Sequence, residues 1–591
     1  MIVTRLRQMS LMLFAMAVSF IGFFQMFERT AGSFPSEYMI LLGVVAVLFI
    51  ILWSLLLKFQ PYASQSILPC VLLLTGIGTT LISRIDQQKG THVGTRQLIW
   101  LCLALVLCCI LVICLRDYRV LRRFSYVSMV AGIVLLLSPM IPGLGKTIGG
   151  ARIWIGIGSY SLQPGEFAKL FIAFFFAAYL FDHRDQLAVG GKKVLGLQLP
   201  RIKDLGPIMV VWAMSMGVLV IQRDLGTSLM FFAMFVCMLY VATGRKSWIV
   251  IGILAFAAGA VIASRMFAHV DNRIDAWLHP FDAKVYNRQG GSEQLVTGLF
   301  GLASGGLMGT GLGQGHPSLT PLANSDFIYS SVGEELGLTG LLAVLALYLV
   351  IIASGLITAM KIKDGFGKLL ASGLVFTMAV QVFTVVGGIT LVIPLTGLTM
   401  PFMAAGGSSL IANYILITLL LIISNAANKP EPELTSDTFQ YEALAVLRDH
   451  ELKERAKSAA QAAKDDENRP RHGAHASHAA HAEDAEDAVQ ATQIEDAPTI
   501  MVDDASQPEG LYDAEEQDNR DEQGDWADWR DFAADDDSPA TTTSHWPTRG
   551  AQTEQVEDAQ NQAAQDGNGG TPPTPPAPPQ STPRTVKGGA R

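Results

Sequence analysis

Long apolar runs separated by short polar segments fill the first 430 residues of the chain. Most of the runs reach the roughly 17 to 25 residues that a helix needs to cross a bilayer. They lie at 9–27, 38–57, 67–83, 98–115, 124–142, 166–182, 207–221, 226–243, 247–264, 328–358, 367–390 and 409–425. The pattern predicts an all-α polytopic membrane protein with about 12 transmembrane helices.

Lysine and arginine concentrate in alternate loops, which by the positive-inside rule belong in the cytoplasm. These residues are Lys58, Arg116, Arg119, Arg122, Arg123, Arg184, Lys192, Lys193, Arg201, Lys203, Arg245, Lys246, Lys361, Lys363 and Lys368. With twelve spans, both termini are then expected in the cytoplasm, and the loops 143–165, 265–327 and 391–408 outside. The loop 84–97, which contains three cations, departs from this pattern.

Composition divides the chain into two unlike parts. The net charge of −9 and the pI of about 5.7 combine +13 over residues 1–430 with −22 over residues 431–591. The segment 429–591 is acidic and proline-rich and contains few apolar residues, so we expect a disordered cytoplasmic tail. Because the basic residues of the first part sit in short loops and form no single patch, no nucleic-acid partner is expected.

Four stretches place polar residues next to or within the apolar spans, where they are costly and therefore functional candidates. The first is GGARIWIGIGSYSLQPGEFAKL, residues 149–170. Arg152 and Trp154 lie on one side of an extended segment. They could bind a phosphate through the Arg152 cation beside the Trp154 ring, and the alternative is that they anchor the segment at the membrane interface. Glu166 and Lys169 share one face of the following helix, either as a neutralising ion pair or with Lys169 meeting a substrate phosphate.

The second stretch is QRDLGT, residues 222–227, a short charged turn between two apolar runs. Gln222 and Asp224 are candidate substrate contacts, and the alternative is that Asp224 only caps the next helix. The fourth stretch, IPLTGLTMPFMAAGGSSLIAN at 393–413, interrupts helix between two apolar runs and predicts a re-entrant segment lining a cavity. Ser408 and Ser409 are candidate contacts there, or caps of the last helix.

The third stretch is the long outer loop 265–327, which leads into PLANSDFIYSSVGEELG. Asp326 is flanked by apolar residues that would raise the pKa of its carboxyl, as suits a general base. The alternative is a first-turn carboxylate after an N-cap at Ser325, with Ser331 and Glu334 as a capping box. The glycine-rich run before it fits neither a Walker A nor a dinucleotide motif, so no nucleotide is expected.

Taken together, GARIW with QPGEFAKL, QRDLGT, NSDFIYSSVGEELG and PLTGLTMPFMAAGGSS resemble the motifs of the SEDS family, which includes RodA, FtsW and SpoVE. They occur in family order. The resemblance implies a ten-helix SEDS glycosyltransferase core at 67–428, containing the extracytoplasmic loop 265–327, with residues 1–66 as two additional N-terminal transmembrane helices. PLANSDF, VVGGIT and the two extra helices favour the actinobacterial RodA type. Departures are Ala404 and Ala405 before GGSS and Gly165 within QPGE.

The resemblance implies that the protein polymerises lipid II, an undecaprenyl diphosphate-linked disaccharide peptide, into glycan strands at the outer face of a bacterial plasma membrane. This synthesis would serve cell elongation, shape maintenance and division. Asp326 matches the family's catalytic aspartate. The expected substrate-binding residues are Arg152, Trp154, Glu166, Lys169, Gln222, Asp224, Glu334, Ser408 and Ser409. A divalent cation, Mg or Mn, is compatible with this chemistry. The implied protein partner is a class B penicillin-binding protein that supplies transpeptidase activity.

Three other readings stay open. A lipid II flippase is compatible with many helices around a polar cavity, although the outer position of Asp326 favours chemistry over transport. A septal polymerase of the FtsW type is another alternative. A noncatalytic scaffold for wall-synthesis enzymes would need the polar residues only for packing.

Overall fold

The computed structural model describes residues 2–148, 151–157, 160–184, 193–194, 197–198, 209–430 except 211, 214–215 and 218–220, and 447–458 except 449. The chain divides into two compact units, Met1–Gln461 and Ala462–Arg591. Every described residue belongs to the first unit. Most of the tail predicted at 429–591 therefore lies outside the described residues.

Ten helices in the described part are long and apolar enough to cross a membrane. They are α1 (Ile2–Ala31), α2 (Ser36–Phe59), α3 (Ile67–Lys89), α4 (Val93–Cys114), α7 (Pro164–Asp182), α10 (Leu225–Thr243), α11 (Ser247–Met266), α15 (Ile328–Lys361), α16 (Gly365–Ile389) and α17 (Gly407–Asn428). They coincide with ten of the twelve predicted spans, which confirms the polytopic all-α fold.

The other two predicted spans differ. The run 124–142 forms a shorter helix, α6 (Ser125–Leu137), followed by the 3-10 turn η1 (Ser138–Met140), because Pro139 cannot continue the α-helical hydrogen bonding. A one-turn helix, α5 (Val120–Arg123), precedes it. The run 207–221 crosses gaps in the described residues.

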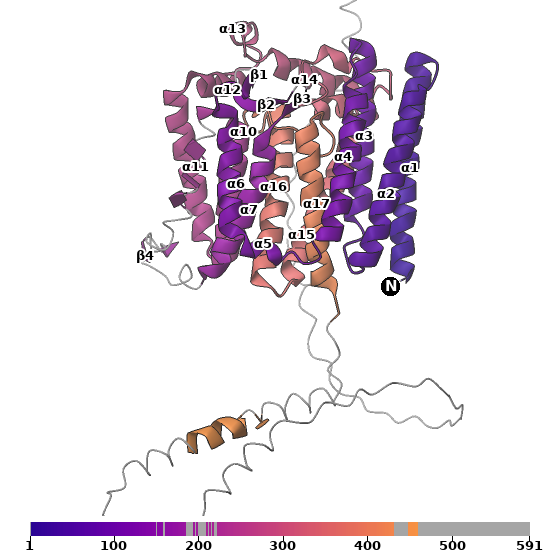
Figure 1. The fold of residues 1–591 in the computed structure, drawn as a ribbon. Helices are drawn as coiled ribbons and strands as arrows, with labels where there is room; N and C mark the ends of the chain where they lie inside the picture. Colours follow the sequence, from indigo (N-terminus) through magenta and orange to yellow (C-terminus); the bar gives the residue numbers. More distant parts are fainter. Residues whose placement is uncertain are drawn as a thin grey trace, which may run out of the picture. The chain divides into compact units, whose positions relative to one another are not determined.

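Burial separates an inner from an outer set of helices. The apolar windows of α3, α7 and α17 are 78% buried and that of α16 is 72% buried, whereas those of α2 and α11 are only 22% and 11% buried. The inner helices thus form the core, and α2 and α11 expose apolar surface, as expected beside lipid. The N-terminal pair packs on the core, α1 against α3 and α2 against α4 (Figure 1).

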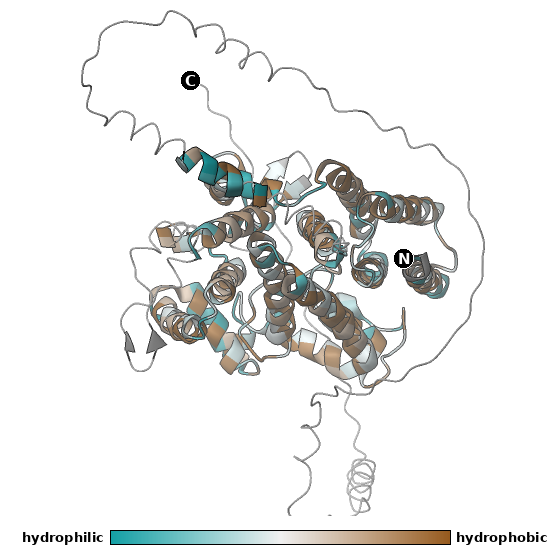
Figure 2. Ribbon diagram, turned by 90° about the horizontal axis from the view of Figure 1, so that it is seen from below, coloured by the Kyte–Doolittle hydropathy of each residue, from teal (hydrophilic) through white to brown (hydrophobic). Residues whose placement is uncertain are grey.

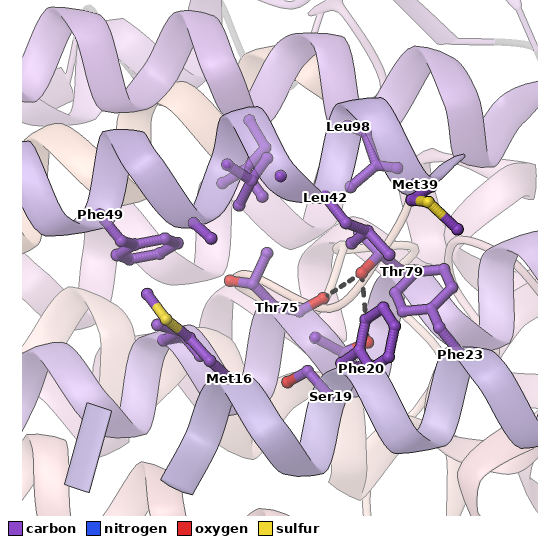
Figure 3. A pocket seen from close by; sticks show the side chains of 16 residues that line it. Met16, Ser19, Phe20, Phe23, Met39, Leu42, Phe49, Thr75, Thr79 and Leu98 are labelled. Atoms are coloured by element: carbon purple, nitrogen blue, oxygen red, sulfur yellow. Dashed lines mark hydrogen bonds between the residues drawn. The ribbon is translucent and has the colours of Figure 1, made fainter. Parts of the chain in front are cut away.

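An apolar cavity of about 340 Å³ lies between this pair and the core. Phe20, Met39 and Thr79 are among its lining residues (Figure 3). The Thr79 hydroxyl donates to the backbone oxygen of Thr75 in its own helix, 2.7 Å away. The lining contains no ionisable side chain, so acid–base chemistry has to be sought elsewhere.

Smaller elements gather at the end of the bundle opposite the N-terminus (Figure 1). Three antiparallel strands, β1 (Gly145–Ile148), β2 (Ala151–Ile157) and β3 (Tyr160–Leu162), form a sheet in the order β1-β2-β3, with Lys146 opposite Trp154. The extended segment expected at Arg152 and Trp154 is thus β2, although its strand partners were not predicted. A separate hairpin joins β4 (Lys193–Val194) and β5 (Leu197–Gln198), and in Figure 1 it lies at the other end of the bundle, the end that bears the N-terminus.

The segment 265–327, predicted as a long loop, contains regular secondary structure. It contains α12 (Ala268–Leu278), α13 (Ala283–Tyr286), α14 (Glu293–Gly305) and the 3-10 turn η2 (Pro317–Leu319). Helix α14 packs along α15. The loop therefore forms a folded layer over this end of the bundle.

Between α16 and α17 the chain runs through residues 390–406 without a helix or strand, as the proline and glycine pattern predicts. The segment is nevertheless buried at Leu398, Met400 and Phe402. Its backbone oxygens accept hydrogen bonds from the Gln381 side chain at Thr399 and from the Gln97 side chain at Ala404. Side chains of the core thus hold this segment, called here the 390–406 segment.

Candidate functional site

Asp326 lies beside a polar cavity of about 260 Å³ at the end of the bundle that bears the sheet. It directly precedes Phe327, the N-cap of α15. Besides Asp326, the polar side chains of the lining are His269, Asn272, Arg273, Gln289 and Gln294. Amides and a carboxylate around a small cavity match the hydroxyl and amide groups of a sugar.

Burial raises the pKa of Asp326 to about 6, while a hydrogen bond from Ser325 and the charge of Arg273 act in the opposite direction. At neutral pH the group is therefore mostly a carboxylate, yet basic enough to accept a proton from a reacting hydroxyl. The alternative N-cap at Ser325 is wrong, because the helix begins after Phe327, and the cap makes no side-chain hydrogen bond.

Arg273, on α12, is the main site residue that the sequence analysis missed. Its guanidinium donates to the backbone oxygens of Leu395, 3.1 Å away, and Thr396, 2.8 Å away. It also interacts electrostatically with Asp224 and Asp326. The only local signal is a cation within the polar segment DNRID, and its hydrogen-bond acceptors lie more than a hundred residues away in sequence.

The 390–406 segment approaches the carboxylate at Gly397, which has φ of 76°. A Cβ atom added there would lie 3.5 Å from Oδ2 of Asp326. The left-handed conformation and the close approach both favour glycine at this position. Arg273 binds the two residues before Gly397. The same cation therefore positions the backbone beside Asp326 and contributes to the electrostatic potential at its carboxylate.

The predicted Asp224 joins Asp326 through Arg273. Its carboxylate accepts from the backbone N–H of Thr227 at 3.0 Å and caps α10, so the capping interpretation is confirmed. Burial raises the pKa of Asp224, as does the charge of Glu166, whereas Arg273 lowers it. Lys169, Glu166, Asp224, Arg273 and Asp326 thus form one series of interacting charges, called here the charged row.

Within the charged row, Lys169 is saturated by the protein. Its ammonium lies 2.7 Å from Glu166 Oε2 and 3.2 Å from both Gln381 Oε1 and Asn413 Oδ1. An ammonium has three donors, and these acceptors use all of them. The side chain is 1% exposed. Of the two interpretations left open for this pair, the geometry favours the neutralising ion pair.

The remaining predicted contacts frame the site without reaching Asp326. Arg152 donates through its backbone to the Gln222 oxygen and through its side chain to Ile141. The Gln222 side chain donates to the Leu136 oxygen. Trp154 lies opposite Lys146 in the sheet. These residues attach the sheet and the QRD turn to the end of α6 and η1.

Ser408 and Ser409 connect α17 to its neighbours. Ser408 Oγ accepts from the backbone N–H of Gln163 at 2.8 Å, and Ser409 Oγ accepts from the Thr399 hydroxyl at 3.0 Å. The alternative that they cap the last helix is wrong, because its N-cap is Gly406. Both serines hold segments that border the charged row.

Glu334 lies on α15 against the glycine-rich loop. Its Oε1 accepts from the backbone N–H of His316 at 2.5 Å, and its own backbone oxygen accepts from Thr310. The neighbouring Glu335 binds Arg84 at 3.3 Å and the backbone N–H of Gly313 at 3.1 Å. These carboxylates organise the loop, and Glu334 is not part of the charged row.

Four residues other than glycine have positive φ in the described part of the chain: Arg223, Leu322, Leu391 and Phe402. Arg223 precedes Asp224, Leu322 lies four residues before Asp326, and the other two lie within the 390–406 segment. Such backbone costs roughly 1 to 3 kcal/mol per residue and clusters at functional sites. All four sit in segments that shape the surroundings of the charged row.

Within the described residues, no three His, Cys, Asp or Glu side chains come close enough to hold a metal ion. The donor set around Asp326 therefore fits a divalent cation only if most ligands come from substrate phosphates and water, as is common for Mg²⁺.

Comparisons with known proteins agree with this architecture. A family model described as "Cell cycle protein", covering FtsW, RodA and SpoVE, matches residues 63–429, more than half of the chain. The chain therefore belongs to the FtsW/RodA/SpoVE family.

The relatives include RodA proteins described as peptidoglycan glycosyltransferases. The protein of Mycobacterium tuberculosis (strain ATCC 25618 / H37Rv) is 44% identical over 380 residues, which are 63% of this chain and 80% of that one. The protein of Mycobacterium leprae (strain TN) is 42% identical over 394 residues, 64% of this chain and 83% of that one. Stage V sporulation protein E of Bacillus subtilis (strain 168) is 31% identical over 314 residues, 52% and 80% of the two chains.

A chain of a solved peptidoglycan synthase complex has the same fold, with a TM-score of 0.51 and 23% identity. The match covers 62% of this chain and 99% of that chain.

Proposed function

We propose that this protein is a peptidoglycan glycosyltransferase that polymerises lipid II into glycan strands. The observation that carries the proposal is the Asp326 carboxylate, whose pKa lies near 6, at a cavity lined by amides and Arg273. The RodA proteins of mycobacteria support it, because they are described as peptidoglycan glycosyltransferases and are 42% to 44% identical.

In the proposed reaction, the 4-hydroxyl oxygen of the lipid II disaccharide attacks the anomeric carbon of a growing strand. The new glycosidic bond forms as the bond from that carbon to the diphosphate oxygen breaks. Asp326 accepts the hydroxyl proton, and the undecaprenyl diphosphate leaves with the electron pair. General-base assistance of this kind typically contributes about 100-fold or more to the rate.

The charge that collects on the diphosphate needs a cation, and Arg273 is the best-placed candidate in the described part of the site. It lines the cavity, whereas Lys169 is saturated by Glu166, Gln381 and Asn413. Arg152 remains a candidate for the outer part of a longer substrate. A divalent cation bound with the diphosphate, Mg or Mn, would neutralise part of the same charge. No nucleotide is needed, since the sugar is activated by its lipid diphosphate.

We further propose a multi-pass location in a bacterial plasma membrane, with both termini cytoplasmic and the active site outside. The positive loops support this orientation, and the N-terminus lies at the bundle end opposite the sheet (Figure 1). The chain is 44% identical to RodA of Mycobacterium tuberculosis but 31% identical to a probable FtsW of Geobacter metallireducens, which supports a role in elongation over a septal one. The expected partner is a class B penicillin-binding protein, in line with the synthase complex that shares the fold.

The test is polymerisation of purified lipid II by the purified full-length protein, with and without EDTA. Asp326→Asn keeps the side-chain volume but removes the proton acceptor, so glycan synthesis should fall by about 100-fold or more while lipid II binding is retained. Asp275→Asn is the matched control, because Asp275 is partly exposed and binds only Arg288 in the described part of the loop. Full activity of Asp326→Asn would contradict its role as the general base. Absence of polymerisation by the wild-type protein would favour the flippase or the scaffold alternative.

A further inference from the structure

A second polar cavity, of about 770 Å³, opens at the end of the bundle that bears the N-terminus, opposite the sheet. Its walls are the start of α1, the segment 61–66 between α2 and α3, one face of α15 and the end of α17. Figure 2 views the bundle from this end and shows that its helices are mainly hydrophobic. The cavity, called here the lower cleft, is remote from the charged row.

The lower cleft has a cationic rim. Arg7 on the second turn of α1 and Lys361 at the end of α15 both line it and are exposed. Neither makes an ion pair with any residue that the structure describes. Deeper in the cleft, part of the wall is polar, and the hydroxyls of Ser64 and Ser354 lie 2.7 Å apart there.

The rim is also held in place by the protein. The nearby Arg5 is buried, and its guanidinium donates to the Gln8 side chain and to the backbone oxygen of Gln60. The backbone N–H of Ser64 donates to Ser424 Oγ at 2.9 Å. These bonds join the start of α1 and the segment 61–66 to the core, so the two rim cations belong to a preformed cleft.

Away from the rim the lower cleft also has apolar side chains in its walls. Leu11, one turn deeper than Arg7, is 42% exposed, and on α15 Ile357 and Val350 are 46% and 41% exposed. Lys361, Ile357 and Val350 share one face of the helix, and the eleven residue steps from Val350 to Lys361 span about 16 Å. The cleft thus joins two cations at the helix ends to an apolar groove along the spans.

We propose that the lower cleft binds an anionic phospholipid, with its phosphate between Arg7 and Lys361 and an acyl chain along Leu11, Ile357 and Val350. Helix ends with cations lie at headgroup depth, and each such cation contributes about 1 kcal/mol of attraction to an anionic membrane surface. The site is independent of the proposed reaction. Its α1 wall lies outside the region matched by the family model, which begins at residue 63.

The acidic segment 431–591 is the competing occupant, because it carries the complementary charge of −22. The apolar wall favours lipid over this segment. A hydrophilic, negatively charged chain would meet the two cations but would leave Leu11, Ile357 and Val350 uncovered, whereas one phospholipid satisfies both parts.

The experiment is native mass spectrometry of the full-length protein titrated with phosphatidylglycerol or phosphatidylcholine. We expect preferential binding of phosphatidylglycerol, and about 30-fold weaker binding in Arg7→Gln, Lys361→Gln, which is the loss of about 2 kcal/mol for two cations. Arg123→Gln, Lys246→Gln is the matched control, since it removes two exposed cations outside the cleft and should bind like the wild type.

Two further arms separate the possible sources of the effect. Ala353→Phe should fill the groove and weaken phosphatidylglycerol binding while both cations remain. Excess inorganic phosphate should not displace the lipid, because it cannot use the apolar wall. Equal binding of both lipids, as expected if the acidic segment occupies the cleft, would overturn the proposal, and so would displacement by phosphate or an unchanged affinity in Arg7→Gln, Lys361→Gln.

Discussion

A single guanidinium, that of Arg273, sets the surroundings of the candidate base. It holds the backbone oxygens of Leu395 and Thr396 and acts electrostatically on Asp224 and Asp326. A positive charge near a carboxylate stabilises the deprotonated form. Arg273 therefore opposes the effect of burial on the acidity of Asp326, and its removal should be visible in the pH dependence of the reaction.

The pH profile of lipid II polymerisation tests this. Asp326 is active as the deprotonated base, so the wild-type rate should fall as the pH drops below about 6, the value to which burial raises its pKa. Arg273→Gln removes a charge that lowers this pKa, so the acid limb should move to higher pH. Arg288→Gln, which affects only a partly exposed pair with Asp275, is the control. An acid limb that stays in place in Arg273→Gln would contradict the assignment.

A second prediction concerns whether the Glu166–Lys169 ion pair stabilises the fold or binds substrate. Lys169→Ala leaves Glu166 as a buried charge without its partner, which should destabilise the protein by about 3 to 5 kcal/mol. The double variant Glu166→Gln, Lys169→Met removes both charges and should unfold at nearly the wild-type temperature and keep most polymerase activity. Thermal unfolding and lipid II turnover measured on all three proteins check this. A stable but inactive double variant would show instead that Glu166 and Lys169 take part in substrate binding.

At this scale the sequence identified acidic and basic residues but not their partners. Asp326 and Asp224 could be found because a carboxylate beside an apolar run is unusual. The acceptors of Lys169 come from positions 381 and 413, and those of Arg273 from 395 and 396. Only the packing of distant helices decides whether such a cation is free or saturated.

Among the elements, the 390–406 segment has the greatest influence on the site. It has no regular structure, is buried by the core and brings Gly397 next to Asp326. Proline and glycine predicted its irregular backbone, and the apolar runs predicted the helices around it. The layer formed by α12, α13 and α14 was missed, because short helices between loops give weaker periodic signals than spans.

Substitution of Gly397 tests this element. At φ of 76°, alanine is strained by about 1 kcal/mol or more, and its Cβ would lie 3.5 Å from Asp326 Oδ2. Because small displacements of a reacting group are costly, Gly397→Ala should lower turnover by about 10- to 100-fold with only a modest loss of thermal stability. Gly165→Ala, at a helical position with open space around its Cβ, should leave both unchanged. Normal turnover of Gly397→Ala would show that the segment does not position the base.

For the whole molecule, the testable property is orientation. Lys284 on α13 and Lys246 before α11 are both exposed and lie at opposite ends of the bundle. In cells, Lys284→Cys should react with an impermeant thiol reagent and Lys246→Cys should not, in a background where the exposed Cys114 is replaced. Labelling only at position 246 would place the cavity beside Asp326 on the cytoplasmic side and would contradict a reaction at the outer face of the membrane. The charge pattern of the loops predicts this orientation.

The N-terminal helix pair touches more than the core helices. Arg29 at the end of α1 donates to the backbone oxygen of Leu312, and Thr30 lies close to Gly313, in the same loop that Glu334 and Glu335 hold from α15. The loop belongs to the region shared with the family, but α1 does not. The conformation of the loop thus depends on residues both inside and outside the region that the family model matches. A change on either side of this contact would select for compensation on the other, so α1 and the loop are expected to vary together among related sequences.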